Sequence, residues 1–155
     1  MSIPAPFAAR LQSWLHVFSY DCYFADALTS GLCDGDERAR WQTAIDTLYR
    51  FVRSGLLYSP HVAGENWEAA SSEYMDYFGV LARSDPFTSD LQEGIQWCMI
   101  DFCSTDSLRE LLGRHRIREH PEEPCDAFIQ ELEQLFEVSG VAWSESPLIP
   151  ICASQ

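Results

Sequence analysis

DERARWQTAIDTLYRFVRSGLL, residues 36–57, carries the clearest structural signal in this 155-residue chain. Apolar side chains recur in it at the spacing of one helix face. Acidic residues stand at its start and arginines at its end, as the helix dipole favours, and Gly55 is a typical stop. The stretch predicts a core helix that leads into a short extended segment. The residues on its inward face are Trp41, Ala44, Ile45, Leu48 and Val52.

Helical spacing recurs along the rest of the chain, so we predict a mainly α fold. The expected architecture is one helical domain over residues 1–155, a bundle of about five to six helices. Residues 21–28 either continue the first helix or form a short second one. The further helices are expected at residues 5–20, 67–83, 90–102, 105–112 and 126–138. In the helix expected at 90–102, the inward stripe would be Leu91, Ile95, Cys98, Met99 and Phe102.

Two hexapeptides resemble each other, SGLLYS at 54–59 and SGVAWS at 139–144. In both, an amphipathic helix runs into Ser-Gly and then into apolar residues. Two interpretations stay open. The likeness is either a coincidence or the mark of two tails that pair as a small two-stranded β patch.

The charge of the chain is strongly acidic and uneven. The net charge is −14, and all ten basic residues are arginines. Residues 63–106 hold nine acids and one arginine, and residues 119–155 hold eight acids and no base. Such a surface repels nucleic acid and anionic membranes and attracts basic proteins. The one basic run, Arg114–Arg118, is expected to be an exposed linker.

The cysteine spacing predicts neither a metal site nor a disulfide framework. No C-x-x-C motif occurs, and the start of the chain lacks the pattern of a secretory signal. We therefore expect reduced, buried cysteines in a cytoplasmic protein. The six are Cys22, Cys33, Cys98, Cys103, Cys125 and Cys152.

The sequence singles out no catalytic motif. There is no nucleophile elbow, no glycine-rich phosphate loop and no H-E-x-x-H zinc motif, and the absence of lysine excludes lysine-based catalysis. His16 is expected to be partly buried and hydrogen-bonded, and His115 and His120 are too poorly spaced to share a helix face. The expected protein is not an enzyme and has no cofactor and no metal ligands.

Acids and aromatics are mixed between residues 65 and 101, and this mixture is the best candidate for a binding surface. Carboxylates steer a basic partner, and tyrosines give contact area at low entropic cost. The competing interpretation is a solvated helix face with tyrosines in the core, and the spacing of Tyr74, unlike that of Tyr77, suits the core. The candidate partner-binding residues are Glu68, Glu73, Asp76, Tyr77, Asp85, Asp90 and Glu93.

The run WQTAIDTLYRFVRSGLLYS at 41–59, a Trp-led amphipathic helix closing on Ser-Gly and apolar residues, resembles the small acidic immunity proteins that bacteria encode beside contact-dependent and type VI secreted toxins. The resemblance implies a protein that binds one toxin domain and occludes its active site. Cytoplasmic placement would favour a nuclease or nucleotide-consuming toxin as the partner, since nucleases carry basic clefts that an acidic face complements.

Two alternatives from other classes remain. A small cytoplasmic helical enzyme or ligand-binding protein would form its pocket between helices and leave no linear motif. A DNA mimic would space its acids like phosphates along one face, which the interleaved aromatics disfavour.

Overall fold

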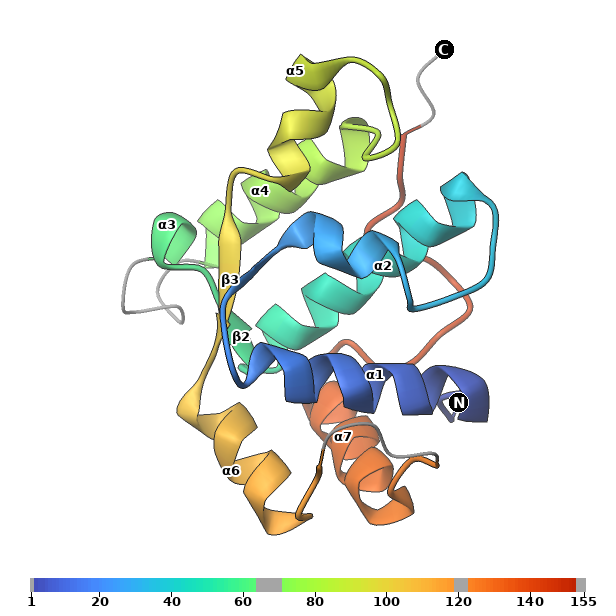
Figure 1. The fold of residues 1–155 in the computed structure, drawn as a ribbon, viewed down its shortest axis with the longest axis vertical. Coiled ribbons are helices and arrows are strands. Elements are labelled where there is room, and N and C mark those ends of the chain that lie inside the picture. The colour runs from blue at the N-terminus through green and yellow to red at the C-terminus, as the bar shows by residue number, and fades with distance from the viewer. Residues whose placement is uncertain (1, 64–70, 119–122, 153–155) are drawn as a thin grey trace.

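The computed structural model describes residues 2–63, 71–118 and 123–152 (Figure 1). Among the described residues, none of the helices has the length and apolar character needed to cross a membrane. The elements, in chain order, are α1 (Ala5–Phe18), β1 (Tyr23–Phe24), the 3₁₀-helix η1 (Ala25–Thr29), α2 (Glu37–Arg53), β2 (Leu57–Tyr58), α3 (Pro60–Ala63), α4 (Ser71–Arg83), α5 (Leu91–Gly94), the 3₁₀-helix η3 (Ile95–Trp97), β3 (Asp101–Ser104), α6 (Asp106–Arg114) and α7 (Asp126–Val138).

The expected core helix is α2, and its ends are set as the sequence indicates. The Asp36 side chain caps the start by accepting a hydrogen bond from the Ala39 backbone N–H at 2.8 Å. At the other end Gly55 adopts a φ of 74°, in the region that favours glycine. The Leu56 N–H then bonds to the Phe51 carbonyl at 2.9 Å, which closes the helix.

Helix α2 lies at the centre of the molecule, with α4 and α5 towards one end and α6 and α7 towards the other (Figure 1). Its Phe51 ring lies 6.4 Å from that of Phe136 on α7. On the opposite side the Tyr49 ring lies 5.3 Å from Phe78 on α4. All five predicted inward residues of α2 are buried, so its predicted core role is confirmed.

The predicted helices α1, α6 and α7 are also confirmed, and the fold is mainly α as expected. Thr105 caps α6 by accepting from the Leu108 N–H at 3.3 Å. Helix α4 begins at Ser71, and the expected start of this helix at 67–70 lies outside the described residues. Residues 21–28 do not continue α1: they form β1 and then most of the short helix η1, so the expected short second helix is present only in the latter part of this stretch.

The β-structure is a three-stranded antiparallel sheet with the order β1-β3-β2. Tyr23 pairs with Phe102 on one side of β3, and Tyr58 pairs with Cys103 on the other. The apolar tail after α2 therefore pairs with β3. The alternative in which it pairs with residues 141–144 is wrong, because that segment is irregular and lies on α2.

The helix expected at 90–102 is also wrong. The chain there forms one turn of α5, a turn of η3 and then β3, so it changes from helical to extended spacing after Trp97. Trp97 and Phe102 enter the core, with exposed fractions of 1% and 0%. Leu91, Ile95 and Met99, expected to point inward, are exposed at 85%, 48% and 58%.

The irregular segment 141–151 is held against α2 by polar side chains. Arg50, 3% exposed, donates from Nε to the Val141 carbonyl at 3.1 Å, and its guanidinium lies 4.9 Å from the Trp143 ring. One turn earlier, Asp46 Oδ1 accepts from the Leu148 and Ile149 N–H groups at 3.1 and 3.0 Å. The C-terminal segment thus covers a stripe of α2 that would otherwise face water.

Candidate functional site

The acids predicted to bind a partner are partly exposed and partly half-buried in the structure. Glu73 and Asp76 project from α4 and are exposed, as is Asp90 at the start of α5. Within the described residues 72–101, six acids stand against one arginine. Glu68 lies outside the described residues. This part of the surface therefore carries a concentrated negative charge.

Three of these acids have local structural roles. Asp85 Oδ1 accepts from the Phe87 N–H at 2.9 Å, and Glu93 Oε1 accepts from the Asp85 N–H at 3.1 Å. Asp90 caps α5 by accepting from the Gln92 N–H at 2.9 Å. These bonds shape the loop between α4 and α5. Asp85 and Glu93 are half-buried, so Asp90 is the most available of the three to a partner.

Tyr77 is a core residue, contrary to its expected surface position. It is 8% exposed, and its hydroxyl donates to the Gln96 carbonyl at 3.2 Å. Burial raises the pKa of the phenol, so Tyr77 stays neutral and donating. The bond joins α4 to η3, which brings the exposed acids of α4 and the exposed apolar residues of the next segment onto adjoining elements.

Leu91, Ile95 and Met99, the apolar stripe of the sequence that we expected in the core, are exposed. Their spacing of four residues is the same for an inward and an outward helix face, so periodicity alone cannot tell the two apart. Two features of the sequence could have indicated the outward orientation. Gly94 weakens a helix, and the large aromatics Trp97 and Phe102, which are buried, lie off the stripe of Leu91 and Ile95 or at its end. We call the set that combines this stripe with the exposed acids the α4–α5 surface, and its residues are Glu73, Asp76, Asp90, Leu91, Ile95 and Met99.

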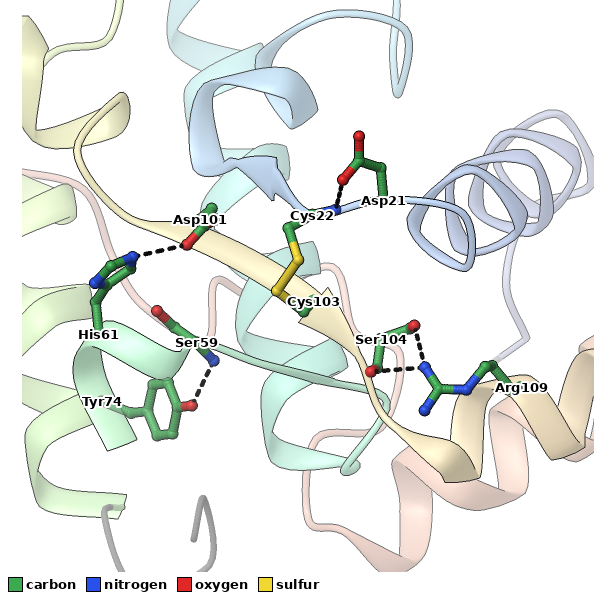
Figure 2. Close-up of a disulfide and its surroundings, with 9 residues drawn as sticks. All are labelled: Asp21, Cys22, Ser59, His61, Tyr74, Asp101, Cys103, Ser104 and Arg109. Atoms are coloured by element: carbon green, nitrogen blue, oxygen red, sulfur yellow. Dashed lines mark hydrogen bonds and ion pairs between the residues drawn. A yellow bond between two sulfur atoms is a disulfide. The ribbon is translucent and has the colours of Figure 1, made fainter. Parts of the chain in front are cut away.

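A disulfide joins Cys22 to Cys103, so the expectation that all the cysteines are reduced is wrong (Figure 2). The sheet register explains the pairing. Tyr23 faces Phe102, and one residue further along both strands Cys22 faces Cys103 with a Cα–Cα distance of 4.4 Å. Pairing across 81 residues depends on strand register, which no local sequence pattern reveals. The four free cysteines are Cys33, Cys98, Cys125 and Cys152.

Asp101 lies beside this disulfide on β3 and faces His61 of α3 (Figure 2). The distance from His61 Nε2 to Asp101 Oδ1 is 3.2 Å. The contact does not form a hydrogen bond, and Asp101 Oδ1 is one of two buried side-chain polar atoms of the described residues that lack a hydrogen-bond partner. The other is the Ser59 hydroxyl, two residues before His61. Buried polar atoms without a hydrogen bond are rare in folded proteins, and at Asp101 Oδ1 the ring nitrogen of His61 is the polar neighbour.

A groove of about 430 Å³ lies between α6 and α7. At its wall Glu131 accepts from both Arg114 and His115, and the hydrogen bond from His115, followed by that from Arg114, lowers the pKa of Glu131. His115 is also packed edge-on against Phe128. The first two residues of the basic run are therefore bound to α7, while Arg116 and Arg118 are exposed as expected.

A second hollow, of about 400 Å³, lies beside α1 and is lined mainly by apolar atoms. Trp14 and Val17 of α1 and Tyr23 of β1 form much of its wall. Arg10 lines it as well, with its guanidinium paired to Asp34 at 2.6 Å. The hollow offers apolar contact area but no set of converging catalytic groups.

Comparisons with protein-family models, with curated proteins and with solved structures find no match to this chain.

Proposed function

We propose that this protein is an inhibitor of the immunity type, which binds a basic toxin domain through the α4–α5 surface and occludes its active site. The observation that carries the proposal is the exposure of Leu91, Ile95 and Met99 together with the exposure of the acids of α4 and of the start of α5. Exposed apolar residues are typical of an interaction site when they lie together, whereas singly scattered ones are not, and Leu91 and Ile95 lie one turn apart.

The two kinds of side chain would do different work. The carboxylates of Glu73, Asp76 and Asp90 would attract a basic domain and speed encounter, an effect that reaches about 10–1,000-fold in rate. Leu91 and Ile95 would supply the buried apolar contacts that slow dissociation. Met99 adds a flexible apolar side chain that adapts to an uneven partner surface.

A nuclease or nucleotide-consuming toxin that acts in the cytoplasm is the partner class that best fits this charge. Such enzymes bind polyanionic substrates in basic clefts, and an acidic protein surface competes for the same cleft. The inhibitor would work in the same compartment as its target, which makes the cytoplasm the proposed location.

The test is co-expression with a toxic domain, to be sought first among the products of the neighbouring genes. The wild-type chain is expected to restore growth and to form a one-to-one complex with that domain on size-exclusion chromatography. Replacing both Leu91 and Ile95 by alanine should raise the dissociation rate at least about tenfold, because two apolar contacts are lost from the interface. Val138→Ala is the matched control, since Val138 is 81% exposed on α7, away from α5 (Figure 1).

Failure of the wild-type chain to protect against that domain, or to bind it, would count against the immunity proposal. Equal dissociation rates for the Leu91/Ile95 double variant and for Val138→Ala would count against the α4–α5 surface.

The second candidate, a ligand-binding protein, draws on the apolar hollow beside α1. A small apolar compound there would contact Trp14 and Tyr23. Quenching of tryptophan fluorescence by a hydrophobic probe such as anilinonaphthalene sulfonate, abolished by Trp14→Ala, would favour this function over the first.

A further inference from the structure

The segment between α1 and η1 lies mostly on the surface, while the residues on either side of it are anchored in the core. Within it, Tyr20 and Phe24 are 67% and 47% exposed. The anchors are Phe18, the last residue of α1, and Ala25, the first residue of η1, which are 1% and 0% exposed. Segments with few buried contacts open at low free-energy cost, so residues 19–24 can open without unfolding their anchors.

Strand β1, which lies in this segment, has little noncovalent hold on the sheet. It consists of Tyr23 and Phe24, which pair with Phe102 and Asp101 of β3. Strands in folded proteins usually have about three to ten residues, so this pairing is shorter than most. Further support comes from the Tyr23 ring, which packs edge-on against Phe18 with 5.6 Å between the ring centroids.

The Cys22–Cys103 disulfide adds a covalent link at this place (Figure 2). Cys22 directly precedes β1, and Cys103 lies in β3. Strand β3 is held independently of this link, because its Phe102 side chain is 0% exposed and its other edge pairs with β2. The disulfide therefore joins a loosely held strand to a firmly held one.

We propose that the Cys22–Cys103 disulfide is a redox switch, in which the oxidised form holds β1 on β3 and reduction releases residues 19–24 while the helical core stays folded. The proposal does not depend on the function proposed above. In the proposed cytoplasmic location the reduced form would be the resting one, because cytosolic reductants keep thiols reduced. Oxidation would then fix β1 in place.

The exchange balances with a dithiol as reductant. One thiolate of the dithiol attacks the sulfur of Cys22, because Cys22 is exposed whereas Cys103 is half-buried. The Cys22–Cys103 bond breaks, and the second thiol of the reductant then displaces Cys22 and completes the reductant's own disulfide. Two electrons and two protons pass from the dithiol to the two cysteines. In the reverse reaction a disulfide oxidant such as glutathione disulfide takes up the same electrons and protons.

Release of β1 would change two features of the surface. Tyr23 forms the wall of the apolar hollow beside α1 together with Trp14 and Val17, so the hollow would lose part of its wall in the reduced form. Strand β1 is also the outer strand in the order β1-β3-β2. Without it, β3 becomes an edge strand with unpaired backbone groups.

The test measures amide hydrogen exchange by mass spectrometry on the full chain carrying Cys98→Ser and Cys152→Ser, which removes the two exposed free thiols. The oxidised chain is compared with the chain reduced by dithiothreitol, at exchange times at which the amides of α7 stay protected in both. Residues 19–24 are expected to exchange at least about tenfold faster in the reduced chain. Far-ultraviolet circular dichroism should stay unchanged, and glutathione disulfide should restore the slow exchange.

A second variant removes the disulfide without a reductant. Cys22→Ser and Cys103→Ser, added to the same chain, should give the fast exchange of residues 19–24 in oxidising buffer, and dithiothreitol should not change it further. The chain with Cys98→Ser and Cys152→Ser alone is the matched control, since it also replaces two cysteines but keeps the bond.

Equal exchange of residues 19–24 in the oxidised and reduced chains would overturn the proposal. Loss of the helical circular-dichroism signal on reduction would overturn it too, because the disulfide would then hold the whole fold and not one strand. A chain that forms no Cys22–Cys103 bond in oxidising buffer would have the same consequence.

Discussion

Single residues of α2 explain how the C-terminal segment is fixed. Gln42, Asp46 and Arg50 recur every four residues on one stripe, which a sequence pattern assigns to solvent. They are polar because they bond to backbone groups of residues 141–151. Gln42, for example, donates from Nε2 to the Ile149 carbonyl at 2.9 Å and accepts from the Ile151 N–H at 3.1 Å. The sequence could not reveal these bonds, because the backbone N–H and C=O groups of residues 141–151 are the same as those of any other segment.

Replacing Asp46 by alanine should therefore lower the free energy of unfolding by about 2–4 kcal/mol, since two backbone N–H groups lose their acceptor. Urea unfolding followed by circular dichroism measures the change. Glu37→Ala is the control, because Glu37 lies exposed in the first turn of the same helix and should change stability by less than about 1 kcal/mol. A loss of the same small size for both variants would mean that Asp46 does not hold the tail.

Asp46 also predicts a pH dependence. Burial raises the pKa of this carboxyl above its ordinary value of 3.8, against the opposing pull of the Ile149 N–H and of Arg50. The folded state therefore holds the proton more tightly than the unfolded state. The stability linked to this group is complete below pH 3.8 and is lost as the pH rises through the folded pKa.

Asp46→Asn keeps the acceptor oxygen and removes the titration. The stability of the wild type minus that of Asp46→Asn should therefore fall as the pH rises from about 3 to 7. Taking the difference between the two proteins cancels the other titrating groups. A difference that stays constant, or that grows with pH, would contradict the raised pKa.

At the scale of elements, the sequence predicts helices well and strands poorly. Helices α1, α2, α6 and α7 were visible because caps, stops and periodicity are all local. The strands β1 and β2 have two residues each and β3 has four, and their pairing joins segments far apart in the chain. The disulfide and its neighbours Asp101 and His61 depend on that pairing and were missed with it.

In the segment 91–104, too, long-range contacts decide the structure and local sequence spacing misleads. Its apolar residues fit a helix, but Phe102 pairs with Tyr23 in the sheet and Trp97 donates from Nε1 to the Ser84 carbonyl at 2.6 Å. Pairing and this buried bond override helical preference after η3. The exposure of Glu73 and Asp76 was predicted correctly, whereas the apolar half of the α4–α5 surface was not.

Because Leu91 faces outward and Trp97 inward, the stability cost of mutation should be small at Leu91 and large at Trp97, the reverse of what an inward helix stripe would give. Leu91→Ala should change the free energy of unfolding by less than about 0.5 kcal/mol because the side chain is exposed. Trp97→Ala should cost about 3–5 kcal/mol, since it empties a core position and removes the bond to Ser84. Chemical denaturation of both variants gives the comparison. A large loss for Leu91→Ala would support an inward helix stripe instead.

At the scale of the whole molecule, the disulfide links the N-terminal region to β3 across 81 residues. A crosslink that closes a loop of this length restricts the unfolded chain and stabilises the fold by about 4 kcal/mol. Reduction should therefore lower the free energy of unfolding by that amount. The Cys22→Ser/Cys103→Ser double variant should match the reduced protein, and Cys98→Ser should match the oxidised one. Identical stability of the oxidised and reduced chains would show that the crosslink restrains little.

Net charge also acts at this scale, because a charge of −14 creates a field that extends about 10 Å into a solution of 0.1 M salt. If the α4–α5 surface binds a basic toxin domain, the association rate should fall as salt is added, while the dissociation rate should change less.

Glu73→Arg combined with Asp76→Arg should slow association at low salt by about tenfold and flatten the salt dependence. Glu137→Arg combined with Glu145→Arg makes the same change in net charge at exposed positions outside this surface. Stopped-flow or surface-plasmon measurements at several salt concentrations separate a local from a global effect. Equal slowing by the two double variants would assign the attraction to net charge alone, and no slowing by the first would remove α4 from the interface.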